Sequence, residues 1–143
     1  AVSITNAYKS YSRQLMATFF RSNRYWYEFS RLVRPRNPYR QKPFPDFDRR
    51  KAEMWSADIE ELSTWISGIE SDGKGVPVLL RQYLKLGGKL IGFNVDPEFS
   101  NVLDGLIMVD LRQADPKLLG RYMGREAAER FLAHNDDSHL RSA

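Results

Sequence analysis

The sequence has no cysteine among its 143 residues. Disulfide bonds, thiolate metal sites and thiol nucleophiles are therefore excluded. Histidine is almost as scarce, and both examples, His134 and His139, lie near the C-terminal end. A zinc site built on them would need carboxylates to complete the ligand set. We therefore expect no metal cofactor.

Long hydrophobic runs are also missing. No stretch approaches the roughly 20 apolar residues that cross a bilayer. Residues Ala1 to Thr5 show no basic segment followed by an apolar one, so we expect no secretory signal. A cytoplasmic location is expected, with peripheral contact to the inner membrane left open. Because the chain does not begin with methionine, we expect a processed protein or a piece of a longer one.

Positive charge is concentrated in the first third of the chain. Residues 1–51 carry 12 Lys and Arg against three acidic residues, whereas residues 52–143 carry 10 against 15. A basic front half and an acidic back half indicate different surroundings for each.

Arginines alternate with aromatic residues between positions 21 and 40. The arginines that we expect to bind an anionic surface are Arg21, Arg24, Arg31, Arg34, Arg36 and Arg40. This pattern suits a membrane surface, where Trp and Tyr lie at headgroup level. It also suits RNA, through ring stacking and phosphate contacts, or a helix pair docked on the rest of an enzyme. We rank docking and membrane contact above RNA, because the sequence has no RNA-binding fold signature.

Apolar spacing divides the chain into helices and strands. It predicts helices over 5–33 (with a break at Ser22-Asn23), 57–69, 77–86 and 116–133. Thr5 or Asn6 is expected to cap the first helix and Ser56 the second. Apolar runs predict strands over 89–95 and 105–111, the latter central, with a turn or short helix over 97–104. The four prolines within residues 34–50 predict an extended surface segment.

These elements predict an α+β protein, mostly helical, with a small mixed sheet. We divide the chain into a basic aromatic helical arm (1–34), a proline-rich linker (35–56), an α/β domain (57–135) and a frayed tail (136–143). The length allows one sizeable core.

Two neighbouring motifs carry a family resemblance. Between Gly73 and Gly88, a glycine-rich turn precedes the pattern P-x-L-L-x-x-Y-L-x-L-G, which begins at Pro77. Between Gly92 and Leu106, a turn containing Asp96 and Phe99 precedes an apolar strand. Together they resemble the C-terminal part of bacterial hemolysin-like acyltransferases. That group includes ornithine-lipid N-acyltransferases, and some members are fused to a glycerolipid acyltransferase domain.

The resemblance covers roughly residues 70–111. It implies an acyltransferase domain, or a fragment holding half of an N-acetyltransferase-like fold. Such a domain would move a fatty acyl group from acyl-CoA or acyl-carrier protein to an amine or a lyso-lipid. An upstream acyltransferase domain or a partner subunit is implied as well. The chain departs from the family at residues 92–95, where many relatives have a C-G-E-P type run, and it lacks the His-x-x-x-x-Asp pair of glycerolipid acyltransferases.

The resemblance also nominates site residues. The turn after Glu70 has the spacing of an acyl-CoA loop, and the residues expected to bind the donor are Gly73, Lys74, Gly75, Val76 and Arg81. The alternative is an ordinary turn between two helices, with Arg81 and Lys85 on a solvated face. Asp96 and Asp104 are candidate general bases toward an amine or hydroxyl. The alternative there is turn chemistry, because Asp-Pro and Asp-Gly are common turn pairs.

A non-catalytic role is the second hypothesis. The chain would then be an accessory or docking module that binds a partner protein, an anionic membrane surface or RNA through residues 8–42. Its support is the basic charge of that half and the lack of a strong catalytic constellation.

Overall fold

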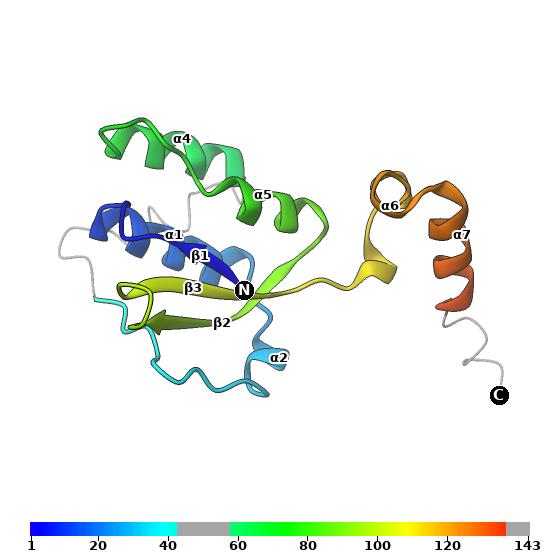
Figure 1. Ribbon diagram of the computed structural model, residues 1–143, viewed down its shortest axis with the longest axis horizontal. Helices are drawn as coiled ribbons and strands as arrows, with labels where there is room; N and C mark the ends of the chain where they lie inside the picture. The colour runs from blue at the N-terminus through cyan, green and yellow to red at the C-terminus, as the bar shows by residue number, and fades with distance from the viewer. Residues whose placement is uncertain (43–57, 137–143) are drawn as a thin grey trace.

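The computed structural model describes residues 1–42 and 58–136. They form an α+β fold, as predicted (Figure 1). Its elements are β1 (Val2–Ile4), α1 (Ser10–Asn23), α2 (Tyr27–Ser30), α4 (Ile59–Ile69), α5 (Val78–Lys85), β2 (Lys89–Asp96), β3 (Val102–Met108), the 3-10 turn η1 (Leu111–Gln113), α6 (Pro116–Met123) and α7 (Arg125–His134).

The sheet is antiparallel throughout, which corrects the expectation of a mixed sheet. Its strand order is β1-β3-β2, so the prediction of a central β3 is confirmed. β1 was not predicted, because an apolar alternation over three residues is too short to indicate a strand. β1 lies at one edge of the sheet, and its outer side has no partner strand among the described residues.

The bounds of β3 differ from the prediction by three residues. Ser100 and Asn101 adopt positive φ values of 57°, which close the turn quickly and let Val102 pair with Asp96. The expected turn or short helix over 97–104 is therefore only a short turn. β3 ends before position 111 because the Asp110 side chain accepts a hydrogen bond from the amide of Arg112 and starts η1.

The helical region predicted over 5–33, with its break, corresponds to the two helices α1 and α2. α1 begins at Ser10, so the expected caps Thr5 and Asn6 are wrong; a turn from Thr5 to Tyr8 precedes the helix instead. The chain breaks just after the predicted point, at residues 24–26, where the backbone pairs with β2. The Leu90 amide donates to the Arg24 carbonyl at 2.7 Å, and the Trp26 amide donates to the Leu90 carbonyl at 2.8 Å.

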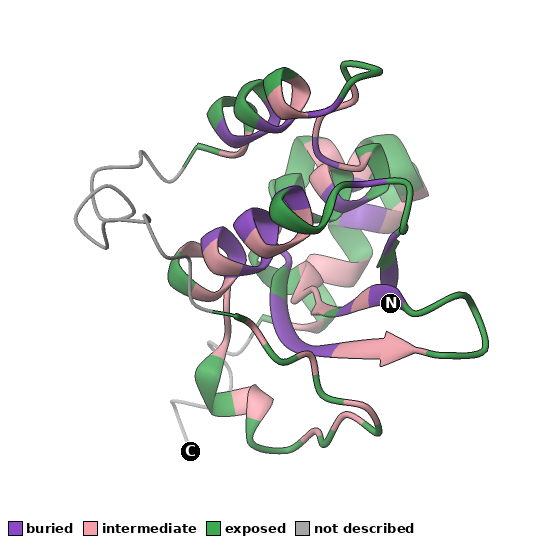
Figure 2. Cartoon of the chain, turned by 90° about the vertical axis from the view of Figure 1, so that its left-hand side faces the viewer, coloured by how far each residue is buried: buried purple, intermediate pink, exposed green. Residues whose placement is uncertain are grey.

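One hydrophobic core joins the first and second halves of the chain. α1 lies between the sheet and the α4–α5 layer (Figures 1 and 2), and its buried side chains include Leu15, Phe19 and Phe20. The same core contains Leu62 and Ile66 of α4, Leu80 and Leu84 of α5, and buried side chains of all three strands. Residues 1–23 are therefore part of the central body, whereas the sequence predicted an arm. Charge and aromatic content do not reveal that the apolar face of α1 packs on a distant strand.

The helices predicted over 57–69 and 77–86 are confirmed as α4 and α5. Asp58 caps α4 by accepting from the Glu60 amide, and the expected cap Ser56 lies outside the described residues. Trp65 of α4 is 51% exposed. The predicted final helix is divided into α6 and α7 at Gly124, whose φ of +84° no continuous helix permits.

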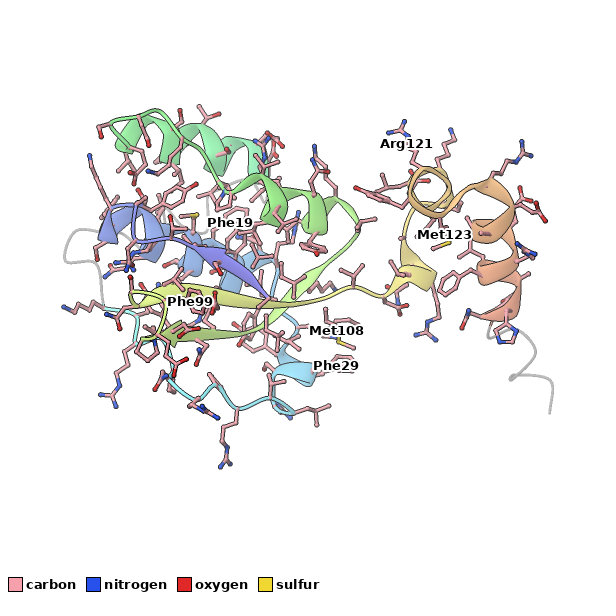
Figure 3. All side chains as sticks on the ribbon, in the orientation of Figure 1. Phe19, Phe29, Phe99, Met108, Arg121 and Met123 are labelled. Carbon is pink, nitrogen blue, oxygen red and sulfur yellow. The ribbon has the colours of Figure 1, made fainter. Side chains whose placement is uncertain are left out.

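The α6–α7 pair stands apart from the sheet and its covering helices (Figure 1). It has its own small cluster, made by Ala114, Leu119 and Ala128. Met123 lies between the two helices (Figure 3). Within the described residues, every helix is too short or too polar to cross a bilayer.

Candidate functional site: the open face of the sheet

The two faces of the sheet differ in chemistry. The face toward α1 is apolar and includes Ile4, Phe93 and Leu103. Cross-strand pairing places Ser3, Asp104 and Asn94 in one row on the opposite face. We call this side, which also holds Gly92, Leu106, Asp96 and Val102, the open face.

Two cavities border the open face. The first cavity, of about 460 Å³, is lined by Ala1, Leu32, Val33, Arg34, Pro35, Gly92, Phe93, Asn94, Asp104 and Leu106. The second cavity, of about 470 Å³, is lined by Ala1, Ser3, Thr5, Asn6, Asp96, Phe99, Ser100, Val102 and Asp104. The first is mostly apolar and the second is more polar. Asp104 lines both.

Asp104 keeps one carboxylate oxygen available. The Ser3 hydroxyl donates to its Oδ1 at 2.5 Å. No other hydrogen bond and no ion pair to Asp104 is present within residues 1–42 and 58–136, although Arg34 lines the same cavity. The second oxygen can therefore accept a hydrogen bond from a ligand, and the negative charge favours a cationic one.

The wall of the first cavity is an extended segment held against β2. The Val95 amide donates to the Asn37 carbonyl at 2.8 Å, and the Asn37 amide donates to Asn94 Oδ1 at 2.8 Å. Earlier in the segment, Val33 lies over Gly92, where an added Cβ would be 3.7 Å from Val33 Cγ2. Residues 34–42, predicted as an extended surface segment, contain no helix; they bend at Arg36 and Asn37 and form a bridge between Pro38 and Asn94. Pro43 and Pro45 lie outside the described residues.

Asp96, the other candidate base, reaches only the second cavity. Its Oδ1 accepts a hydrogen bond from the amide of Glu98 at 3.0 Å and so stabilises the turn between β2 and β3. Phe99, at that turn (Figure 3), is 73% exposed and lines the same cavity. The structure therefore brings Asp96 and Asp104 to one cavity, and Asp96 also has the turn role that the alternative interpretation gave it.

The glycine-rich turn is closed by its neighbours. A Cβ at Gly75 would overlap the Ser63 hydroxyl of α4, and the Val76 amide already donates to that hydroxyl at 3.0 Å. The Tyr8 hydroxyl donates to the Gly75 carbonyl at 2.7 Å. Gly73 has a φ of +69°, which the tight turn requires. Neither of the two cavities is lined by residues 70–78. The glycines here allow close packing between the turn, α4 and Tyr8.

The two charged residues nominated for donor binding also have protein partners. Lys74 Nζ donates to the Ala7 carbonyl at 2.8 Å and pairs with Asp72 at 2.9 Å. The hydrogen bond to Asp72 raises the pKa of Lys74 and lowers that of Asp72. Arg81 pairs with Glu60 at 3.1 Å, so its charge is partly neutralised within the helical layer.

Glu70 is a buried carboxylate behind this turn. Its pKa is lowered, first by the Ser12 hydroxyl and then by the Lys9 amide, which donates at 2.9 Å; burial opposes the shift. The Ser12 hydroxyl makes no hydrogen bond of good geometry, so we assign its effect to the dipole beside the carboxylate. Glu70 ties the start of α1 to the end of α4 and is a structural group.

The six arginines nominated for an anionic surface divide into two sets. Arg21 packs over the Phe93 ring, 5.4 Å from its centroid, and donates to Gln41, while Arg24 is partly buried and donates to the Asn23 carbonyl. The four that follow are exposed: Arg31, Arg34, Arg36 and Arg40.

No group of three or more His, Cys, Asp and Glu side chains able to hold a metal ion is present in the described parts of the chain. His139 lies outside them.

The sequence predictions missed two parts of the open-face site. Ser3 was not identified because β1 was not, and residues 32–35 were assigned to a helix end and a linker. The only signal that could have placed Ser3 beside Asp104 is the short apolar alternation of residues 2–4.

Comparisons with protein-family models, with curated proteins and with solved structures gave no match. The acyltransferase resemblance therefore depends on the two sequence motifs alone.

Proposed function

We propose that this chain is an acyl-transfer domain, or part of one, that binds an amine acceptor at Asp104. One observation carries the proposal: Asp104 has an unpaired carboxylate oxygen where a mostly apolar cavity adjoins a second, somewhat more polar one. A carboxylate at this place suits an ammonium group, and the apolar cavity beside it suits a hydrocarbon chain. The reaction type comes from the family resemblance.

In the proposed reaction the bound ammonium group first loses one proton to solvent, and the resulting amine nitrogen attacks the carbonyl carbon of a fatty acyl thioester, supplied by acyl-CoA or acyl-carrier protein. A C–N bond forms and the C–S bond breaks. Asp104 takes the proton from the nitrogen as general base and returns it to the departing thiolate. The Ser3 hydroxyl, bonded to Oδ1, fixes the orientation of the carboxylate. A lyso-lipid hydroxyl would be activated in the same way.

The described elements would supply part of an N-acetyltransferase-like fold in this proposal. The outer edge of β1 supports that idea, because a strand with unpaired backbone groups is suited to adding a further strand. An upstream domain or a partner subunit would provide it.

The structure supports only part of the alternative hypothesis, that the chain is a docking module binding through residues 8–42. Residues 10–23 form α1, whose apolar face lies in the core and is not available to a partner. Within residues 8–42 the exposed arginines are Arg31, Arg34, Arg36 and Arg40, and Lys9 and Lys42 are exposed as well.

The test is acyl transfer with labelled acyl thioesters and a panel of amines and lyso-lipids, comparing the chain with Asp104→Asn. This variant keeps the size and the Ser3 contact but removes the negative charge. We expect turnover to fall by about 10²–10⁴-fold, the usual effect of losing a general base. Glu98→Gln, an exposed carboxylate in the adjacent turn, is the control and should leave turnover unchanged.

Two results would contradict the proposal. One is an Asp104→Asn variant as active as Glu98→Gln, with both folded by circular dichroism. The other is an unaltered chain that turns over no thioester and binds no long-chain amine.

A further inference from the structure

Exposure alternates from residue to residue along the segment 34–41. Successive side chains of an extended backbone point to opposite sides. The arginines lie on the outer side of the segment, because Arg34, Arg36 and Arg40 are exposed, whereas Pro35, Asn37, Tyr39 and Gln41 are partly buried. Because the segment is hydrogen-bonded to β2, this orientation is fixed by the fold.

Arg31 and these three arginines form what we call the basic edge. Within residues 1–42 and 58–136, none of the four pairs with an acidic side chain. By contrast, Arg125 and Arg130 on α7 both pair with glutamates. The basic edge therefore presents positive charge that the described protein does not neutralise.

An exposed aliphatic side chain lies in the same stretch. Leu32 is 79% exposed, directly after Arg31 and two residues before Arg34. A leucine flanked by unpaired arginines matches a lipid surface, where the apolar group enters the acyl region and the guanidinium groups contact phosphates.

The aromatic rings nearby are poorly placed for stacking on bases. Trp26 and Phe29 pack edge to face, 4.3 Å between centroids. Tyr27 packs against Tyr25 at 4.8 Å, and its hydroxyl donates to the Arg21 carbonyl at 2.9 Å. Nucleic-acid binding without sequence preference uses open aromatic platforms, so the exposed groups here favour lipid over RNA.

The basic edge adjoins the first cavity at Arg34. Arg34 lines that cavity together with Leu32, Val33 and Pro35, and Asp104 lines it as well. A surface bound to the edge would therefore adjoin the entrance to the proposed acceptor site.

We propose that the basic edge binds the surface of an anionic lipid bilayer, with Leu32 inserted, so that the first cavity takes its amphiphilic substrate directly from the membrane. The docking itself rests on the exposed charge and on Leu32, and the delivery of substrate rests on the function proposed above.

The test is flotation of the full chain with vesicles of phosphatidylcholine, with or without phosphatidylglycerol. We expect binding only to the anionic vesicles, weakening as salt is added. The triple variant Arg31→Gln, Arg36→Gln, Arg40→Gln should bind them about 10²-fold more weakly, because each arginine near such a surface contributes about fivefold. Leu32→Ser should weaken binding further.

The matched control removes the same charge elsewhere. Arg121→Gln, Arg125→Gln, Arg130→Gln changes three exposed arginines of the α6–α7 pair, among them Arg121, which projects from α6 (Figure 3). This control should bind anionic vesicles almost as well as the unaltered chain. Equal weakening by both triple variants would show a general charge effect and overturn the proposal.

Further outcomes separate docking from catalysis. If the basic-edge variant loses vesicle binding but still acylates a soluble short-chain amine, docking and the acceptor site are both supported. If vesicle binding depends on the basic edge but Asp104→Asn remains active, docking stands and the proposed function fails. Failure of the unaltered chain to bind anionic vesicles would overturn the docking proposal. So would binding to single-stranded RNA that is tighter than binding to the vesicles and is abolished by the basic-edge variant.

Discussion

Glu70 shows how a single buried carboxylate stabilises the start of α1. Its pKa is lowered in the folded chain, so folding favours the charged form. Stability from this group is therefore present above the ordinary pKa of glutamate and is lost as pH falls through the lower folded value. The positive charges of Lys74 and Lys9 also lower the pKa of Glu70. Lys74 Nζ lies 3.9 Å from the Glu70 carboxylate.

Glu70→Gln should lower the free energy of unfolding by about 1–3 kcal/mol at neutral pH, because it leaves the Lys9 amide with a weaker acceptor. The difference from the unaltered chain should shrink as pH falls below about 4, where the glutamate becomes protonated in the unfolded chain, and disappear below the lower folded pKa. Urea unfolding across this pH range measures both effects. Glu98→Gln, on an exposed residue, serves as control. A difference independent of pH would contradict the assigned role of the Glu70 charge.

At the scale of elements, the turn between α4 and α5 tests whether its glycines serve packing or anion binding. A Cβ at Gly75 would overlap the Ser63 hydroxyl and lie 3.0 Å from the Ser63 carbonyl oxygen. Gly75→Ala should therefore destabilise the fold by about 1–3 kcal/mol. Gly68→Ala, in α4 with open space around the new methyl, should stabilise it by about 0.5–1 kcal/mol.

Thermal unfolding of the two glycine variants provides the comparison. If the turn were an acyl-CoA loop, Gly75→Ala would weaken donor binding without lowering stability. That outcome would support the turn as an acyl-donor site and would contradict its assigned role in packing.

At the scale of the whole molecule, two separate clusters predict two levels of stability. Leu119 is almost fully buried in the α6–α7 cluster, and Phe20 is fully buried in the main core. Leu119→Ala should cost about 2–5 kcal/mol and should act locally. In hydrogen exchange, residues 116–134 should lose protection while β2 and β3 keep theirs. Phe20→Ala should lower protection throughout the sheet. Equal loss in both regions after Leu119→Ala would show a single cooperative unit.

The parts of the fold that the sequence predicted are those with a long, periodic pattern. α4, α5 and β2 have apolar spacing over eight or more residues, and their bounds differ from the prediction by two residues or fewer. β1 is too short for such a pattern, and the start of β3 depends on backbone dihedrals at Ser100 and Asn101 that composition does not reveal. That α1 belongs to the core follows from packing between residues distant in sequence.

The sequence predicted individual residues of the candidate site, but not how the fold arranges them. The sequence nominated Asp96 and Asp104 for their chemistry, and the fold brings them to one cavity. Ser3 and the wall formed by residues 32–35 arise from strand pairing and from an extended segment lying beside β2. The glycine turn matched a motif by spacing, but Ser63 and Tyr8, which close it, come from other elements.

The most direct test of the acceptor site is the map of backbone amide shifts when a long-chain primary amine is titrated into the isotope-labelled chain. We predict that the largest changes fall on residues 32–35, 92–94 and 104–106, and that Asp104→Asn removes them. Changes centred on residues 70–78, or a pattern that Asp104→Asn leaves intact, would contradict an acceptor site on the open face.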